Sequence, residues 1–513
     1  MMNALSLELI DFVVLELVKL IVRDTATDET AKKLLAPYAR ISKKFQAAVE
    51  RHLYRVTQVS SQQPERFQAI NAYPHRKAAL QDLHYVIELP AYDPRRRYSL
   101  ERHHEHCANQ SAFQGGLASL WNVLGGWAKP PSLFLDLSAS SPSDEAGFEA
   151  DSRWLCPEHS LELDRQKVQL PKVECVNRLA VAKAGRRIHP AALNTIVLTL
   201  PNLRVLDLEM HAVQRRHGNL RAEYTAALAK TLQAPTLQQL EVLSLSLWEY
   251  PPANHHFQTG LGHDPSYPEG DILSHAIREL AQRSLKELNL SDLVPISPAL
   301  FGAPEDGGGT EKVFPHLEHV QIRFPIFTYD GRWYYTGDPD DLEPEELDPD
   351  EQERSDHGPS LDSDSDSGSD NDSALSINMD RADFLNGNTP LFQWRTSPDP
   401  TMFNPLVRSA TAATLRMPKL RNLLLTTEAC AHSWSDYEEE MEPQFAININ
   451  YATPGCYLGT LRYPNMSVEG DARCRWVVKL GPSVRWDMPE DIQEMMKEKM
   501  GEDGDVVIYR SRS

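Results

Sequence analysis

The most regular feature of this sequence is a short hydrophobic pattern, apolar-x-x-apolar-x-apolar, that occurs six times. Each copy ends in an alternating run, so its successive side chains point to opposite faces of a short strand and its leucines share one buried side. Apolar residues at helical spacing lie between copies, as in 220–232 and 272–280. The pattern therefore predicts strands that alternate with helices. The six copies have their apolar positions at Val176/Leu179/Val181, Leu203/Leu206/Leu208, Leu240/Leu243/Leu245, Leu285/Leu288/Leu290, Leu317/Val320/Ile322 and Leu420/Leu423/Leu425.

A strand–helix unit that is too short to fold alone is stabilised by stacking on the next copy. We therefore predict an α/β fold in which residues 58–337 form an irregular leucine-rich-repeat-like solenoid, with the last repeat at 400–440. Residues 441–513 are predicted to form a C-terminal α/β cap over the last hydrophobic face. An ordinary α/β sheet is the alternative interpretation of the same strands and helices.

Three short helical segments are predicted at the N-terminal end. Apolar residues recur at three- and four-residue steps between Ser6, which can cap the first helix, and Ile21. Pro37 interrupts the second segment, and the third begins near Ser42. Charged residues interrupt the first segment, so we predict an amphipathic helix rather than a membrane span or a signal peptide. A module this small buries little by itself and is expected to need a partner surface.

Two stretches of this N-terminal region, LSLELI at 5–10 and LAPYARISKKFQ at 35–46, resemble an F-box over residues 3–57, particularly the form in filamentous-fungal proteins. The resemblance implies a trihelical module that docks on the Skp-family adaptor of a cullin–RING ubiquitin ligase. Ser6 stands where an F-box usually has proline, and Phe45 where it often has tryptophan. A helical hairpin that packs only on its own chain is the alternative. Carried over by position, the adaptor-binding residues are Leu5, Leu9, Ile10, Leu35, Ile41 and Phe45.

The same resemblance implies that the chain is a non-catalytic substrate receptor of a Skp–cullin–F-box ligase, in the cytoplasm and/or nucleus. The client protein is expected on the open strand face, where polar side chains alternate with the buried leucines. The alternative is a protein-interaction scaffold with no role in ubiquitin transfer. The predicted client-binding residues are Asp207, Glu209, Ser244, Ser246, Asn289, Ser291, Gln321 and Arg323.

Most of the formal net charge of −21 comes from one segment. Residues 338–372 contain sixteen Asp and Glu against a single Arg354, so they contribute −15 and leave −6 for the rest of the chain. With few apolar residues to bury, residues 338–380 are predicted to be a disordered acidic insertion. Because the remainder is nearly balanced, we expect neither a nucleic-acid nor a membrane partner. Three serines there have an aspartate three residues on and are candidates for acid-directed phosphorylation, with a plain solvated linker as the alternative: Ser363, Ser367 and Ser369.

The sequence contains no motif that indicates catalysis. A GxSxG elbow, a P-loop, a Rossmann glycine fingerprint and an HExxH pair are all missing, so we predict no enzyme activity and no cofactor. The densest group of metal-binding side chains is HHEHC at residues 103–107. Adjacent residues on one helix diverge around its axis, so we predict no metal site there, although an enzyme of unknown class would most simply be sought around it. Six scattered cysteines without a CxxC pair suit a reducing compartment.

Overall fold

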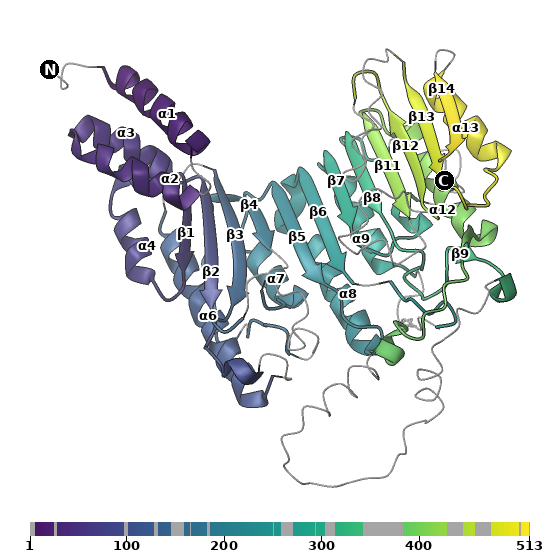
Figure 1. The fold of residues 1–513 in the computed structure, drawn as a ribbon, viewed down its shortest axis with the longest axis horizontal. Coiled ribbons are helices and arrows are strands. Elements are labelled where there is room, and N and C mark those ends of the chain that lie inside the picture. Colours follow the sequence, from purple (N-terminus) through teal and green to yellow (C-terminus); the bar gives the residue numbers. More distant parts are fainter. Residues whose placement is uncertain are drawn as a thin grey trace, which may run out of the picture. The chain divides into compact units, whose positions relative to one another are not determined.

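The computed structural model shows an N-terminal group of helices followed by strands and helices that alternate along the chain (Figure 1). None of its helices in the described part of the chain is long and apolar enough to cross a membrane. The structure describes residues 6–24, 28–96, 101–127, 132–144, 159–164, 166–181, 185–249, 251–257, 270–292, 294–302, 313–341, 381, 383–427, 445–456, 473–501 and 504–511.

The N-terminal helices begin and end where local sequence signals place them. The Ser6 hydroxyl accepts a hydrogen bond from the Leu9 amide at 3.3 Å, and the Ser42 hydroxyl accepts one from the Phe45 amide at 3.2 Å. Both serines therefore satisfy an amide that a helix start would leave unpaired. Pro37 lies where the second helix gives way to a 3₁₀ turn. These elements are α1 (Leu7–Asp24), α2 (Asp28–Leu35), η2 (Ala36–Arg40) and α3 (Lys43–Leu53).

A twelve-stranded sheet follows, with strand order β1-β2-β3-β4-β5-β6-β7-β8-β11-β12-β13-β14. Most neighbours are parallel, including β1 to β5, β7 with β8, and β8 with β11. β12 runs antiparallel to both of its neighbours, and β14 is again parallel to β13. The strands are β1 (Val56–Ser60), β2 (Asp82–Glu88), β3 (Leu133–Ser140), β4 (Val176–Val181), β5 (Val205–His211), β6 (Val242–Trp248), β7 (Glu287–Ser291), β8 (His319–Arg323), β11 (Asn422–Thr427), β12 (Ile447–Ala452), β13 (Arg475–Leu480) and β14 (Asp505–Arg510).

Helices lie in the connections between the strands, and α6 (His103–Gly125) packs against β2. Along β2 and β3, buried side chains alternate strictly with partly exposed ones, as expected when only one face is covered. The longer helices are α4 (Pro64–Asn71), α5 (Pro74–Ala79), α6 (His103–Gly125), α7 (Pro190–Val197), α8 (Gly218–Leu232), α9 (Ile272–Ala281), α12 (Pro400–Arg416) and α13 (Glu490–Met500). Short 3₁₀ turns are η3 (Pro94–Arg96), η6 (Pro235–Gln239), η7 (Pro298–Leu300) and η8 (Pro339–Asp341).

The prediction of a leucine-rich-repeat-like solenoid over 58–337 and 400–440 is wrong. The fold is α/β with one twelve-stranded, mostly parallel mixed sheet, in which the strands of both predicted ranges are continuous with the antiparallel strand β12 and with β13 and β14. The sequence pattern does mark real strands, because the six copies lie on or immediately before β4, β5, β6, β7, β8 and β11. The pattern predicts which side of a strand is buried, but it does not predict whether the neighbouring strand runs parallel or antiparallel. Within 441–513, β12, β13 and β14 continue the same sheet.

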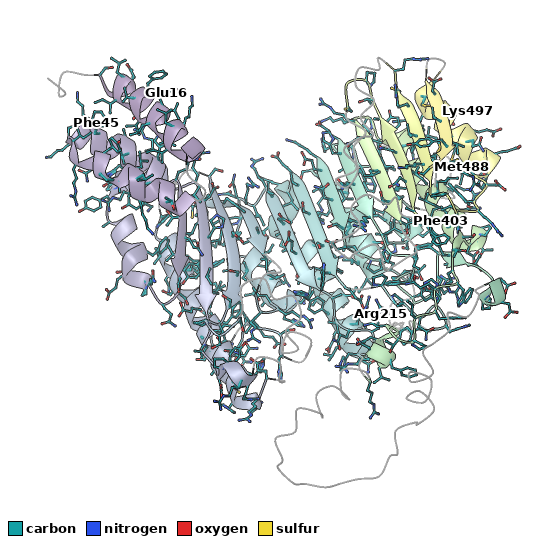
Figure 2. The ribbon with its side chains drawn as sticks, in the orientation of Figure 1. Glu16, Phe45, Arg215, Phe403, Met488 and Lys497 are labelled. Carbon is teal, nitrogen blue, oxygen red and sulfur yellow. The ribbon has the colours of Figure 1, made fainter. Side chains whose placement is uncertain are left out.

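The chain divides into two compact units. The first comprises residues 1–211, 227–245 and 283–285, and its core includes Trp121 of α6, whose indole Nε1 donates to Thr199 Oγ1 at 2.7 Å. The second comprises residues 212–226, 246–282 and 286–513. Its core includes Phe403, which meets the Trp486 ring edge-on at 5.2 Å between centroids (Figure 2 labels Phe403).

Two short strands of the second unit join positions on either side of the acidic segment. β9 (Tyr335–Thr336) pairs antiparallel with β10 (Ser397–Pro398). The first residues of the predicted insertion, 338–341, are described and include the turn η8, while 342–380 lie outside the described residues. Just before β9, an isolated antiparallel bridge joins Phe327 to Trp333, with Gly331 at φ 83° in the turn between them.

Candidate functional site

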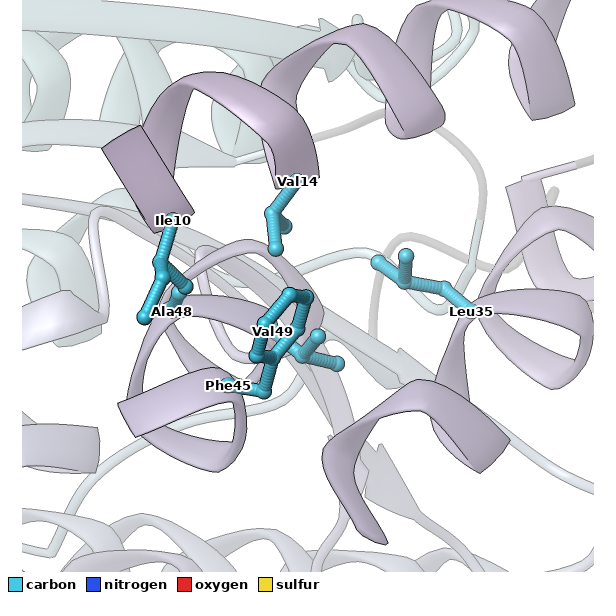
Figure 3. Close-up of a cluster of buried hydrophobic side chains, with 6 residues drawn as sticks. All are labelled: Ile10, Val14, Leu35, Phe45, Ala48 and Val49. Atoms are coloured by element: carbon cyan, nitrogen blue, oxygen red, sulfur yellow. The ribbon is translucent and has the colours of Figure 1, made fainter. Parts of the chain in front are cut away.

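The N-terminal helices have a hydrophobic core of their own. Six side chains from α1, α2 and α3 form a buried cluster (Figure 3), and partly buried residues such as Leu17 and Ile21 pack against it. Among the described residues, the inner side of the module is therefore closed by side chains from residues 10–53. The six members are Ile10, Val14, Leu35, Phe45, Ala48 and Val49.

Helix α1 has a second apolar face that points away from this core. At 100° per residue, Leu9, Val13 and Leu20 lie within about 40° of one another, and Phe12 lies about 60° to one side. Their exposed fractions are 54%, 47%, 58% and 60%. We call these four residues the outer face of α1. On the same helix, Glu16 and Lys19 form an ion pair at 2.8 Å (Figure 2 labels Glu16).

The segment between α1 and α3 exposes further large apolar side chains. Leu34 at the end of α2, Tyr38 in η2 and Ile41 just after it are 50%, 38% and 42% exposed. Single exposed apolar residues are ordinary on protein surfaces, whereas a concentration of them on one small module is typical of interaction sites.

Only some of the predicted adaptor-binding residues are placed where a partner can touch them. Leu9 and Ile41 are exposed, as the prediction requires. Ile10, Leu35 and Phe45 belong instead to the buried core of the module (Figure 3) and hold the helices together. Leu5 lies outside the described residues.

Three exposed residues of the outer face, Phe12, Val13 and Leu20, were not among the adaptor-binding residues predicted from the sequence. The sequence interpretation treated the apolar positions of α1 as one wide stripe. Val13 and Leu20 belong to that stripe, and Phe12 falls beside it. The two faces can be separated by position around the helix axis. Leu9 and Val13 point about 100° away from Ile10 and Val14, because successive residues are rotated by 100°.

A buried carboxylate ties α3 of the module to α5. Glu50 accepts hydrogen bonds from Arg76 Nε at 2.8 Å, Arg76 Nη2 at 2.7 Å and Gln46 Nε2 at 2.9 Å, and its Oε2 lies 2.6 Å from His75 Nε2. The hydrogen bonds from Arg76 are the main reason why the pKa of Glu50 falls from 4.5 to about 2. The outer face of α1 therefore sits on a helical module that is fixed to the rest of its unit.

The predicted client-binding residues alternate with buried apolar residues along their strands, as expected. In the first unit, Asp207 and Ser244 are partly exposed and Glu209 is exposed. Burial and the nearby Glu209 carboxylate raise the pKa of Asp207. In the second unit, Ser246 is buried and donates its hydroxyl to Asp292 Oδ2 at 2.7 Å, so it is not a surface residue. The remaining four, all partly exposed, are Asn289, Ser291, Gln321 and Arg323.

The predicted phosphorylation sites Ser363, Ser367 and Ser369 lie outside the described residues.

The HHEHC stretch forms the first turn of α6, and its side chains diverge as expected. His103, His104 and Cys107 are exposed, with His103 Nε2 and Cys107 Sγ 3.6 Å apart. Glu105 pairs with Arg96 at 2.6 Å. His106 turns inward, toward two residues that the sequence interpretation did not connect with it: Glu101 and His159.

Comparison with known proteins adds no assignment. No protein-family model matches this sequence, and no curated protein matches it.

Proposed function

We propose that the chain is a non-catalytic substrate-recognition subunit of a Skp–cullin–F-box ubiquitin ligase. The observation that carries this proposal is the outer face of α1: four large apolar side chains exposed on a helix whose other side already closes a core. Burying such a side chain against a partner contributes roughly 1.5–3 kcal/mol. Binding of a partner over the outer face of α1 would therefore be favourable.

The resemblance of residues 5–10 and 35–46 to an F-box selects the partner, an Skp-family adaptor. In this role the chain holds a client through polar residues of its sheet and raises the local concentration of client lysines near the ubiquitin carrier. The chemistry belongs to the partners, and the complex acts in the cytoplasm and/or nucleus.

An interaction scaffold with no role in ubiquitin transfer is the second candidate. It is favoured by the burial of Ile10, Leu35 and Phe45, because a module that merely caps its own chain needs only such a closed core. The two candidates differ in what they require of Leu9 and its neighbours. A module that only caps its own chain does not need Leu9 and its neighbours to be exposed, whereas a docking surface for a partner depends on their exposure.

We expect the purified chain to bind a recombinant Skp-family adaptor, and the double substitution Leu9→Glu/Phe12→Glu to weaken binding by at least ~30-fold, as hot-spot residues do. Both side chains are exposed, so the fold should be unchanged, which circular dichroism checks. Affinity is measured by isothermal titration calorimetry with both proteins in solution.

The matched control is Val507→Glu/Ile508→Glu on β14, where two side chains of 44% and 42% exposure receive the same charges. This control should bind as tightly as the unaltered chain. The proposal fails if the unaltered chain does not bind the adaptor, or if the two double variants lose affinity equally. In the first case the scaffold interpretation stands.

A further inference from the structure

Three potential metal ligands from separate segments converge in the first unit. Glu101 precedes α6, His106 lies in its first turn, and His159 comes from a segment more than fifty residues further along the chain. His106 Nδ1 is 3.3 Å and His159 Nδ1 is 3.2 Å from the same Glu101 oxygen, Oε2. One ligand atom from each residue lies within 4.8 Å of the others.

These separations suit a small divalent cation. In a tetrahedral zinc site with bonds of about 2.0–2.1 Å, neighbouring ligand atoms are roughly 3.3 Å apart. The two Glu–His distances are already of this size. The imidazole rings are stacked, with centroids 4.7 Å apart and planes 21° from parallel, so both approach the carboxylate from adjacent positions.

The surroundings fit a bound cation as well. The Glu101 side chain is only 3% exposed, and a buried carboxylate is costly unless it is paired or coordinates a metal. Asn109 Nδ2 donates to Oε1, the other Glu101 oxygen, which leaves Oε2 turned toward the histidines. Such an outer partner orients a carboxylate ligand.

We propose that Glu101, His106 and His159 bind a divalent transition metal of the zinc class. Two imidazoles and one carboxylate are a ligand set that zinc accepts, with a solvent molecule in the fourth position. The metal would cross-link the segment of His159 to α6, which carries His106. It would add to the hydrogen bonds that Ser160 and Glu162 already make with Gln110 of α6. Because the metal would bind the folded chain and not the unfolded one, it would stabilise the folded chain.

The competing arrangement is a hydrogen-bonded group without metal. Gln110 Nε2 lies 3.4 Å from His106 Nε2 and also donates to the Ser160 carbonyl at 2.9 Å. If Gln110 donates to Nε2, the ring proton of His106 sits on Nδ1 and points at Glu101. Metal binding at Nδ1 moves that proton to Nε2, so the hydrogen bond from Gln110 to Nε2 is lost while Gln110 keeps its bonds to Ser160 and Glu162. The two arrangements therefore make opposite predictions about metal uptake.

The test begins with the full chain freed of metal by a chelator and titrated with ZnCl₂. We expect one zinc ion per chain, by elemental analysis after desalting, and a rise in the unfolding temperature. His106→Ala and His159→Ala should each weaken zinc binding by ~100-fold or more, since each removes a ligand. The control His103→Ala/Cys107→Ser removes the exposed His–Cys pair from the same turn of α6 and should leave affinity unchanged.

A spectroscopic readout keeps the test decisive if the histidine variants fold poorly. Co²⁺ added to the unaltered chain should give the visible absorption of a four-coordinate nitrogen and oxygen site, without the near-ultraviolet band of a thiolate ligand. A thiolate band would place the metal at Cys107. That result, no uptake of either metal, or zinc lost in the His103/Cys107 control would each overturn the proposal.

Discussion

Replacing Glu50 with glutamine is expected to lower the free energy of unfolding of the first unit by about 3 kcal/mol at pH 7. The carboxylate is buried and receives a two-point contact from Arg76, whose guanidinium also lies over the rings of Tyr54 and Tyr73, 4.8 and 4.4 Å from their centroids. A glutamine keeps the shape but leaves the charge of Arg76 without its partner. Urea unfolding, with hydrogen exchange of α3 and α5, measures the loss.

The pH dependence of stability provides a second readout. The pKa of Glu50 is about 2 in the folded chain and 4.5 when unperturbed, so the unfolded chain binds a proton first as the pH falls. The contribution of Glu50 is therefore complete above about pH 5 and is lost between there and pH 2. The Glu50→Gln variant should lack this part of the acid-induced loss.

The control is Asp11→Asn, which removes an ion pair with Arg51 at 2.7 Å between side chains that are 32% and 52% exposed. An exposed pair contributes little, so we expect a change below about 1 kcal/mol. Equal losses in the two variants, or the same acid response in Glu50→Gln as in the unaltered chain, would contradict the assignment of Glu50 as the anchor of the module.

Replacing Glu249 with glutamine is expected to destabilise the second unit by about 3–5 kcal/mol. Glu249 Oε1 lies 3.2 Å from Arg215 Nη2 and 2.9 Å from Arg221 Nη1, and the arginine side chains are only 1% and 9% exposed (Figure 2 labels Arg215). Burial lowers the pKa of Arg215 to about 10, so it stays charged at neutral pH. Without Glu249, two buried guanidinium groups lose their shared carboxylate.

Chemical denaturation monitored in the second unit measures this effect. Glu318→Gln is the matched control, because Glu318 pairs with Arg421 at 3.4 Å on the surface, where Arg421 is 61% exposed. It should change the unfolding midpoint little. A Glu249→Gln variant with an unchanged midpoint would mean that the backbone carbonyls of Val213 and Asn386, which accept from Arg221 and Arg215, suffice to hold both charges.

The sequence was most informative where the determinants are local. Ser6 was predicted to cap the first helix and the third helix was predicted to begin near Ser42, and both serines make capping bonds. Pro37 was predicted to break the second helix, and the 3₁₀ turn η2 contains it. Alternating burial was predicted for the strands from a period of two, and β5, with Leu206 and Leu208 buried, follows it.

The remaining features depend on partners that are distant along the chain. Leu9 and Phe45 are equally apolar, yet one faces solvent and the other a core, because only the packing of α1 on α3 separates them. The direction of β12 depends on its path after β11, which the strand pattern does not encode. His159 joins Glu101 and His106 only through the fold, so no local spacing could have drawn attention to it.

The pairing of β9 with β10 has a consequence for how this protein can change over evolutionary time. Thr336 and Ser397 lie opposite each other, so segments on the two sides of residues 342–380 are hydrogen-bonded to one another within the folded unit. Adding or deleting residues between 342 and 380 then changes closure entropy only slowly and leaves the ladder of β8 with β11 in register. We therefore expect changes in the length of this segment to be inherited more readily than changes in β9 or β10, whose pairing holds its flanks together.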